Sequence, residues 1–471
     1  MEPIITYYSR LEEKILQNIN RNGIRYRLAN SGLWLGALVG LSAAVTILKE
    51  ESSYSETCLF VGTTGFGLVF CSLCLYIRLS MNQVIAKDFH AIYFLPAIIT
   101  SMLFLLAANK GLLTSVVWGL TVGSLGTWGI PQLMSVFPYC FTVGEATAVI
   151  HSFILFLMSV VTNLPLRYHL PPIHDSDIST VLLQVVILYV VSVCFLCGYF
   201  PILHSTRYFY LMIISLLCFI ILPILYIVLD QNPVTWIISF AFNSHKRIAI
   251  FIYWAICLLL SILAIIYQIL LNSQATSSTR KNFHILATFV YIPGIIYDPS
   301  LLYLASGVML VLFIALEVIR FFKIPPLGEI LQQGFLAFAD GKTDFLLSLT
   351  PIYLLCGLSF PLWMPTNNLP LLILLSGVLT VGIGDAAASF VGSKWGLHKW
   401  VDTKKTVEGT IACVFCQICV ILMLTYCGFM DNYQLLMRSI LAIVLISLIE
   451  ARTNQVDNLA LPLLMYVFLM V

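Results

Sequence analysis

The chain has 471 residues, of which 60% are hydrophobic and only 10% charged, and its formal net charge is +2 at pH 7. A mean hydropathy of +0.97 excludes a water-soluble globular protein, because a chain of this composition has too few polar side chains to cover its surface. The small net charge also predicts no nucleic-acid partner, since proteins that bind nucleic acid carry strongly basic surfaces.

Residues 1–30 mix charged and apolar side chains and contain no apolar segment of the kind found in signal peptides. We expect them to form a cytosolic N-terminal arm that is either an amphipathic helix or loosely ordered. The apolar run that follows, near residues 33–48, is then expected to serve as the targeting signal.

Long apolar runs occupy most of the remaining chain and predict an all-α, polytopic membrane protein. They approach the roughly 20 residues that cross a bilayer core, and they lack the alternation of membrane β-strands, so helices best satisfy their backbone polar groups. From these runs we predict about fifteen transmembrane helices. They lie near residues 33–48, 57–77, 89–108, 111–129, 144–164, 179–200, 207–229, 248–271, 283–299, 300–319, 346–363, 369–391, 409–430, 435–449 and 457–471.

These helices divide into two regions after the arm. Residues 31–271 are expected to form an N-terminal membrane region of about eight helices, and residues 272–471 a catalytic membrane domain of about seven. In the second region, pairs of spans separate the polar segments 272–281, 320–345, 392–408 and 450–456, which therefore face one side of the membrane. These segments hold every Lys and Arg of that region except Arg438, and the positive-inside rule makes their side cytosolic.

Three acids lie at the predicted membrane boundary. Asp385 directly follows the apolar run LLILLSGVLTVGIG, Glu450 closes ISLIE, and Asp457 precedes the last apolar run. Carboxylates at this depth are costly to bury and are candidates for function. Glu450 is expected to orient Asn458 or a lysine.

The segment GDAAASFVGSKWGLHKWVDTKKTVEGT, residues 384–410, gathers charge in an otherwise apolar region. Lys404 and Lys405 offer positive charges for phosphate oxygens, while Asp385 and Asp457 offer the hard oxygen ligands that Mg²⁺ prefers. Its glycines either let the backbone approach a phosphate chain or form a small-residue face for helix packing. The sequence has no GxxxxGK[ST] loop and no protein-kinase motif set, so neither common soluble phosphotransfer scaffold applies.

Ordered motifs from residue 280 onward resemble the polyprenol and dolichol kinase family, and the segment FPYCFTVGEA at 137–146 resembles it more loosely. The matching pieces are Arg280, Lys281, Phe283 and His284, then YIPGIIYDP, LEVIR, TPIYLLCG, GDAAASFVG, TKKTVEGT and EARTNQVDNLALPL. One departure follows Phe338, where the family has closely spaced acids. Asp340 matches, but Gly341, Lys342 and Thr343 follow it.

The resemblance implies a multi-pass enzyme of the endoplasmic reticulum membrane with cytosolic active-site loops. Such an enzyme uses CTP and Mg²⁺ or another divalent cation to phosphorylate dolichol or polyprenol, and its product, dolichyl phosphate, is the lipid carrier for protein glycosylation. We expect Asp457, Asp385 and Lys405 to be catalytic, with Asp385 and Asp457 as metal ligands. The residues expected to bind CTP are Gly384, Ser389, Gly392, Lys404, Lys405, Thr406, Glu408, Gly409, Arg280, Lys281, His284 and Asn458.

Other functions remain open at this point. CTP:phosphatidate cytidylyltransferases share the D-x-x-A-x-x-x-G and KK-T-x-E-G motifs but continue with a D-R-x-D pair, whereas Asn458 stands here in place of the Arg. Other lipid kinases, acting on phytol or diacylglycerol, are a closer alternative. A membrane transporter would place ionisable residues within several spans and show paired repeats. Glu145 and Glu317 are the few such residues, and no repeat is evident.

Overall fold

The computed structural model describes residues 2–49, 56–81, 94–172, 174–271, 277–339, 344–365, 369–401, 403–429 and 432–471. The described residues form helices joined by loops, with one isolated β-bridge between Lys399 and Thr406. Eight of the described helices are long and apolar enough to cross a membrane. The prediction of an all-α, multi-pass membrane protein is therefore confirmed.

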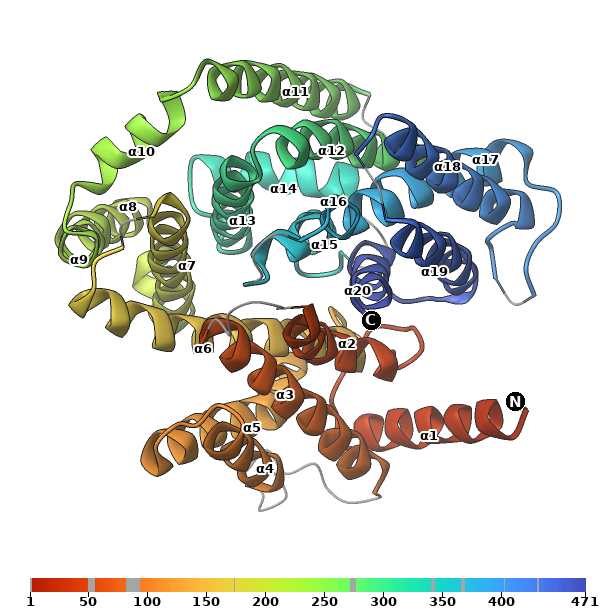
Figure 1. Cartoon of the computed structure of the whole chain (residues 1–471), viewed down its shortest axis with the longest axis horizontal. Coiled ribbons are helices and arrows are strands. Elements are labelled where there is room, and N and C mark those ends of the chain that lie inside the picture. The colour runs from red at the N-terminus through yellow and green to blue at the C-terminus, as the bar shows by residue number, and fades with distance from the viewer. Residues whose placement is uncertain are drawn as a thin grey trace.

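The N-terminal helices form the lower body in Figure 1. They are α1 (Glu2–Arg21), α2 (Leu33–Val45), the short η1 (Thr46–Lys49), α3 (Glu56–Ser80), α4 (Phe94–Leu106), α5 (Leu112–Val136) and α6 (Val143–His169). The arm proves to be an amphipathic helix, because Ile15 and Ile19 of α1 are buried while Lys14 is exposed. Helices α4 and α5 pack closely because Gly123 has no side chain, and a Cβ there would collide with the backbone of Ala97.

A second group of helices runs in an arc along the left and top of Figure 1. It consists of α7 (Asp175–Tyr199), η3 (Pro201–His204), α8 (Thr206–Leu216), η4 (Leu217–Ile221), α9 (Leu222–Leu229), α10 (Pro233–Phe242) and α11 (His245–Leu270). Helix α11 buries few side chains. It is tied to the rest of the chain by an ion pair of 2.6 Å between Arg247 Nε and Asp298 Oδ2 and by a hydrogen bond of 3.1 Å from Trp254 Nε1 to the Val290 carbonyl.

The remaining helices form the centre and right of Figure 1, above the N-terminal helices. They are α12 (Ser277–Tyr297), α13 (Pro299–Phe321), α14 (Leu327–Phe338), α15 (Thr350–Trp363), α16 (Leu371–Leu374), η5 (Val378–Asp385), α17 (Ala386–Trp395), α18 (Val407–Tyr426), α19 (Tyr433–Arg452) and α20 (Asp457–Met470). Helix α20 is buried among them, and its Tyr466 packs edge-on against Phe360 with ring centroids 5.3 Å apart. It crosses α15 at Gly357, where a Cβ would collide with the carbonyl oxygen of Asn458.

Polar contacts fix the ends of α13, α14 and α15. Arg320 binds Glu317 at 2.6 Å, Gln332 at 2.8 Å and the Leu346 carbonyl at 2.7 Å, so it joins three segments. Asp344 caps α15 by accepting hydrogen bonds from the backbone N–H groups of Leu349 and Thr350 at 2.9 and 3.0 Å. Glu317 and Arg320 of the LEVIR motif therefore stabilise the packing of α13, α14 and the segment before α15.

Each predicted span coincides with a helix or with a run of consecutive helices, although the helices often begin or end several residues away. Among the described residues, two α-helices were not predicted: α10, between two spans, and α14, within the polar segment 320–345. The short helix η3 also lies between two predicted spans. The number of transmembrane crossings stays a prediction, because only eight of the described helices meet the length and composition expected of a span. Asp340, Lys342 and parts of the spans at 89–108 and 409–430 lie outside the described residues.

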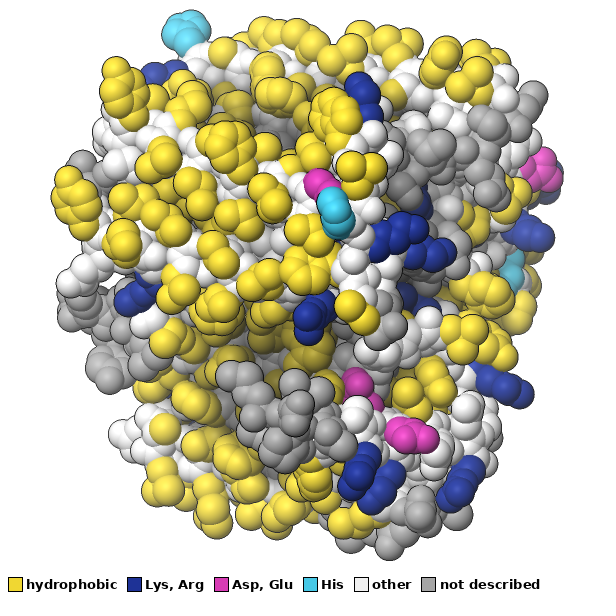
Figure 2. Space-filling view, turned by 90° about the vertical axis from the view of Figure 1, so that its right-hand side faces the viewer, with side chains coloured by type: hydrophobic (Ala, Val, Ile, Leu, Met, Phe, Trp, Pro, Cys, Tyr) yellow, Lys and Arg dark blue, Asp and Glu magenta, His cyan; other side chains and the backbone are white. Residues whose placement is uncertain are grey.

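One hydrophobic cluster contains side chains from the arm and from both predicted membrane regions, including Ile15 of α1, Leu35 of α2 and Met465 of α20. The helices up to α6 thus share a core with the C-terminal helices, and the boundary at residue 272 stays a prediction. Figure 2 shows one face of this body, on which hydrophobic side chains predominate. Most of the charged side chains on that face lie toward its right-hand side.

Candidate active site

The candidate site begins where η5 passes into α17. Residues Val378–Asp385 form a π-helical segment, a geometry that is often found at functional sites because the widened turn redirects side chains. Asp385 ends this segment and is 4% exposed. It forms an ion pair with Lys281 of α12. One turn along α12, His284 Nε2 lies 3.0 Å from Oδ1 of Asn458 and 3.9 Å from Oδ2 of Asp385.

A hairpin between α17 and α18 presents Lys405 to the same place. The Trp400 N–H donates to the Lys405 carbonyl at 3.0 Å, and the Val407 N–H donates to the His398 carbonyl at 2.8 Å. The indole Nε1 of Trp400 also donates to Thr410 Oγ1 at 3.0 Å, which fixes the hairpin to α18. This short and well-bonded turn carries Lys405 toward the ends of α19 and α20.

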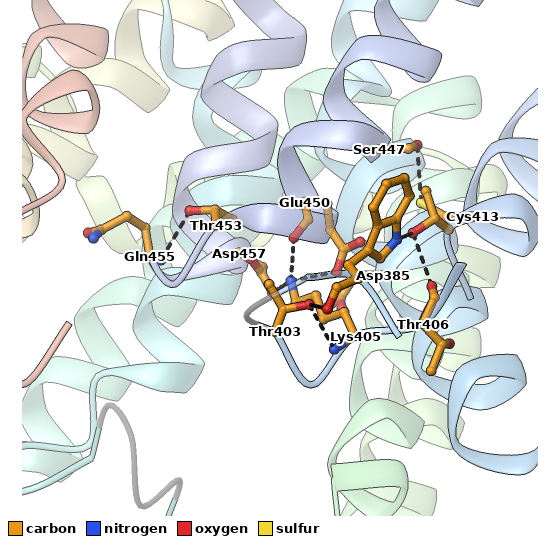
Figure 3. Close-up of polar contacts among 12 residues, drawn as sticks. Asp385, Thr403, Lys405, Thr406, Cys413, Ser447, Glu450, Thr453, Gln455 and Asp457 are labelled. Carbon is orange, nitrogen blue, oxygen red and sulfur yellow. Dashed lines mark hydrogen bonds and ion pairs between the residues drawn. The ribbon is translucent and has the colours of Figure 1, made fainter. Parts of the chain in front are cut away.

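Lys405 joins the two acids that lie on either side of the loop between α19 and α20 (Figure 3). Its Nζ lies 2.6 Å from Glu450 Oε1 and 3.0 Å from Asp457 Oδ2, and it donates a further bond of 2.7 Å to the Glu450 carbonyl. Burial lowers the pKa of Lys405, but the carboxylates of Asp457 and Glu450 raise it by more, so the net shift is upward. Lys405 is therefore charged at neutral pH.

Asp385, Glu450 and Asp457 form an acidic cluster. One carboxylate oxygen from each lies within 4.8 Å of the others, although like charges at this spacing repel one another. Within the described part of the chain, Asp457 Oδ1 is buried and has no hydrogen-bond partner. Carboxylate oxygens from three directions fit a hard divalent cation such as Mg²⁺. In the protein without a bound cation, Lys281 and Lys405 neutralise part of the negative charge of the three acids.

Comparison with known proteins shows the family to which the chain belongs. The family model described as dolichol kinase matches residues 131–340. The mouse protein "Dolichol kinase" is 36% identical over 363 residues, which is 72% of this chain and 66% of the mouse protein. The chain belongs to the dolichol kinase family. "Dolichol kinase EVAN" of Arabidopsis thaliana is 36% identical over 245 residues, covering 50% of this chain and 43% of that protein.

A yeast dolichol kinase, from Saccharomyces cerevisiae, is 29% identical over 240 residues, covering 50% of this chain and 44% of the yeast protein. The chain thus spans about two thirds of the length of its mouse relative and less than half of the plant and yeast relatives. No solved structure matches. The family model ends at residue 340, before the three acids of the cluster.

The site of this dolichol kinase family member brings together six of the residues expected from the sequence. They form two groups of contacts, one around Asp385 and one around Lys405, which meet where the carboxylate oxygens of Asp385, Glu450 and Asp457 lie within 4.8 Å of one another. The six residues are Lys281, His284, Asp385, Lys405, Asp457 and Asn458. Glu450 was expected only to orient another residue, yet its carboxylate is part of the acidic cluster. The position of Glu450 at the end of an apolar run is the sequence feature that could have indicated a place in the cluster.

The predicted glycines lie at close contacts between helices. A Cβ on Gly392 would lie 2.8 Å from Thr406 Oγ1, and one on Gly409 would lie 2.8 Å from the Ala388 carbonyl. A Cβ on Gly384 would reach the amide of Gln417 at 2.5 Å. These contacts support the alternative of a small-residue packing face between η5, α17 and α18. Direct contact of the same glycines with a nucleotide stays a prediction.

The other predicted residues lie around this centre. Thr406 caps α18, and its Oγ1 accepts a hydrogen bond of 3.2 Å from the Gly409 N–H. Glu408 is paired with His398, whose Nδ1 lies 2.6 Å from Glu408 Oε1. The remaining three are on the periphery: Lys404 is exposed, and Ser389 and Arg280 are half-buried. None of these contacts tests a role in CTP binding.

Three of the four polar segments predicted to face one side meet at the site, through Lys281, Lys405 and Glu450. The fourth approaches it through α14, because the Phe338 ring packs edge-on against Phe283 with centroids 5.5 Å apart. Glu145 and Glu317, the two acids within predicted spans that a transporter could use, both form ion pairs with arginines. Glu145 forms an ion pair with Arg27 within the capping box of α6, and Glu317 binds Arg320.

Proposed function

We propose that this chain is a dolichol kinase that transfers the γ-phosphoryl group of CTP to dolichol or polyprenol at the endoplasmic reticulum membrane. The product, dolichyl phosphate, is a lipid carrier for protein glycosylation. The observation that carries the proposal is the acidic cluster, with three carboxylates within 4.8 Å of one another beside Lys405 in a member of this family. The relatives named as dolichol kinases support the acceptor, and the sequence motifs support the donor.

The acidic cluster has the parts that phosphoryl transfer requires. A divalent cation bound there would neutralise charge on the phosphate chain, and Asp385 and Glu450 are the residues that would hold it. Lys281 and Lys405 are ammonium groups that can bind phosphate oxygens as the negative charge shifts toward the leaving CDP. Both lysines pair with the acids in the protein alone, so the phosphate chain would take over some of their bonds.

The remaining acid, Asp457, is the proposed base. The acceptor oxygen forms a bond to the γ-phosphorus, the bond from that phosphorus to the bridging oxygen of CDP breaks, and the hydroxyl proton moves to Asp457. A carboxylate bound to a metal holds protons weakly, so the base and the metal ligands are best separate residues. Asp457 Oδ1, which is buried and without a partner among the described residues, is free to accept this proton.

The proposal is tested with the purified protein in detergent. We expect label from [γ-³²P]CTP to appear on dolichol, with little transfer from ATP and little to diacylglycerol. Label on diacylglycerol alone would reject the acceptor, and equal transfer from ATP would reject the CTP preference. Label transferred from [α-³²P]CTP to a lipid would instead indicate a cytidylyltransferase, since a kinase leaves the α-phosphate on CDP.

A further inference from the structure

A groove of about 570 Å³ lies beside the acidic cluster, between the N-terminal helices and the last two helices. Its polar end is formed by the loop after α19, with Arg452, Asn454 and Gln455. Its apolar wall is formed by Leu445 and Leu448 of α19 and by Phe468 of α20. The groove is therefore amphipathic along its length.

The apolar wall faces outward. Leu445, Leu448 and Phe468 are 37%, 43% and 37% exposed. On a helix of a membrane protein, such side chains contact the hydrocarbon of the bilayer. Leu445 and Leu448 are three residues apart on α19 and so share one face of the helix. A lipid tail can therefore lie along this face and continue into the bilayer.

The polar end of the groove is built from the same segments as the acidic cluster. The loop that lines it connects Glu450 to Asp457, and Trp400 lines it from the hairpin that carries Lys405. The Arg452 guanidinium lies 5.8 Å from the centre of a Trp400 ring, and both residues line the groove. In Figure 3 the side chain of Gln455 points away from Asp385 and Lys405, while Glu450 and Asp457, at the two ends of the same loop, both contact Lys405.

The charge of the lining selects among lipids. Glu12 and Arg452 are the charged residues that line the groove, and their formal charges cancel. An anionic phospholipid headgroup would be drawn to a basic site, whereas this lining fits a neutral polar head. The volume falls in the range of small-molecule sites, roughly 300 to 1,000 Å³, so only the part of a long lipid nearest its head fits inside.

We propose that this groove binds the acceptor lipid, with the isoprene units nearest the hydroxyl along Leu445, Leu448 and Phe468 and the head at the loop between Glu450 and Asp457. This inference rests on the proposed function, because it assigns the place of the alcohol that the acidic cluster phosphorylates. The remaining isoprene units lie in the bilayer. The groove therefore contacts only the isoprene units nearest the hydroxyl, and the far end of the chain makes no contact with it.

Photo-crosslinking tests the proposal on the native protein. A dolichol analogue with a diazirine in the isoprene unit next to the hydroxyl is added in nanodiscs of phosphatidylcholine, and the cross-linked peptides are mapped by mass spectrometry. We expect cross-links in α19 and α20, reduced by excess dolichol. Cross-links confined to other helices, or cross-links that excess dolichol leaves unchanged, would overturn the proposal.

Leu448→Trp tests the same groove by kinetics. We expect the larger ring to raise the KM for dolichol about tenfold, the effect of roughly 1.4 kcal/mol of lost binding, while the KM for CTP is unchanged. Leu422→Trp is the matched control, because Leu422 is a similarly exposed leucine on α18 that does not line the groove. An unchanged KM for dolichol in Leu448→Trp would contradict the proposal.

The two proposals fail in different ways. If the native protein transfers no phosphate from CTP to dolichol, the proposed function is wrong. If it does transfer phosphate but the cross-links map elsewhere, the function stands and the groove assignment is wrong. Should Leu448→Trp fail to fold, as judged by its elution as a single species and by CTP binding, the cross-link map of the native protein decides.

Discussion

The Thr142 hydroxyl donates a hydrogen bond of 2.9 Å to Oε1 of Gln455, joining two residues that are 313 positions apart. Thr142 is the N-cap of α6, and Gln455 precedes the acidic residue Asp457 by two positions. Gln455 also donates a bond of 2.8 Å to the Asn30 carbonyl. The N-terminal helices thus hold the loop that carries one of the three acids.

We predict that Gln455→Ala lowers both stability and activity. The variant leaves the buried Thr142 hydroxyl without this acceptor, at a cost of about 1 to 3 kcal/mol. The Asn30 carbonyl also loses its donor, but Asn30 is exposed and water can replace that bond. Thermal unfolding in detergent should show a lower Tm, and kcat should fall because Asp457 is held less firmly. Gln434→Ala is the control, since Gln434 is exposed on α19. Equal Tm values for the two variants would refute this linkage.

Asp385→Asn should weaken cation binding at the acidic cluster. The substitution removes one of three carboxylates and keeps the size of the side chain, so we expect at least about a hundredfold loss of kcat, as for other removed electrostatic contacts in active sites. Binding of Mn²⁺ to the purified protein, followed by electron paramagnetic resonance, should weaken in parallel. Asp230→Asn, at an exposed position, should bind Mn²⁺ as the native protein does. Retained Mn²⁺ affinity in Asp385→Asn would exclude this metal site.

Lys405→Met should destabilise the protein in the absence of divalent cations. It removes the positive charge between Glu450 and Asp457, and breaking a buried ion pair costs about 3 to 5 kcal/mol; partial exposure of Lys405 reduces this to about half. Added Mg²⁺ should raise the Tm of this variant more than that of the native protein. Lys404→Met, at the exposed neighbouring lysine, serves as the control for stability alone. If Mg²⁺ does not raise the Tm of Lys405→Met, the idea that Lys405 and a bound cation neutralise the same acids is contradicted.

The raised pKa of Lys405 predicts a particular dependence on pH. A group whose folded pKa lies above its unfolded value stabilises the folded state at lower pH and loses this effect as pH rises through the folded pKa. The contribution of Lys405 should therefore stay constant from neutral pH to about pH 10, near the ordinary pKa of lysine. The pH profile of activity should match that of Lys405→Arg over this range. A decline near pH 8 that Lys405→Arg lacks would contradict the assignment.

Much of the fold could be predicted because apolar runs of bilayer length determine helices directly. Helix α14 could not be predicted in this way, since it is short and amphipathic and is held by a contact between Gln332 and Arg320. In the site, Asp385, Lys405 and Asp457 could be selected because charge at a membrane boundary is costly. The contacts between distant segments could not be predicted, because they form only when distant helices pack together. Examples are the ion pair of Lys405 with Glu450 and the hydrogen bond of Thr142 with Gln455.

The burial of α20 affects how the site is assembled. This helix lies among α2, α15 and α19, which precede it along the chain, and it supplies Asp457 and Asn458. Because these helices are synthesised before α20, the surfaces that receive α20 stay open until it is made. The acidic cluster can therefore form only after α20 has packed, and Gly357 leaves the space that this packing needs.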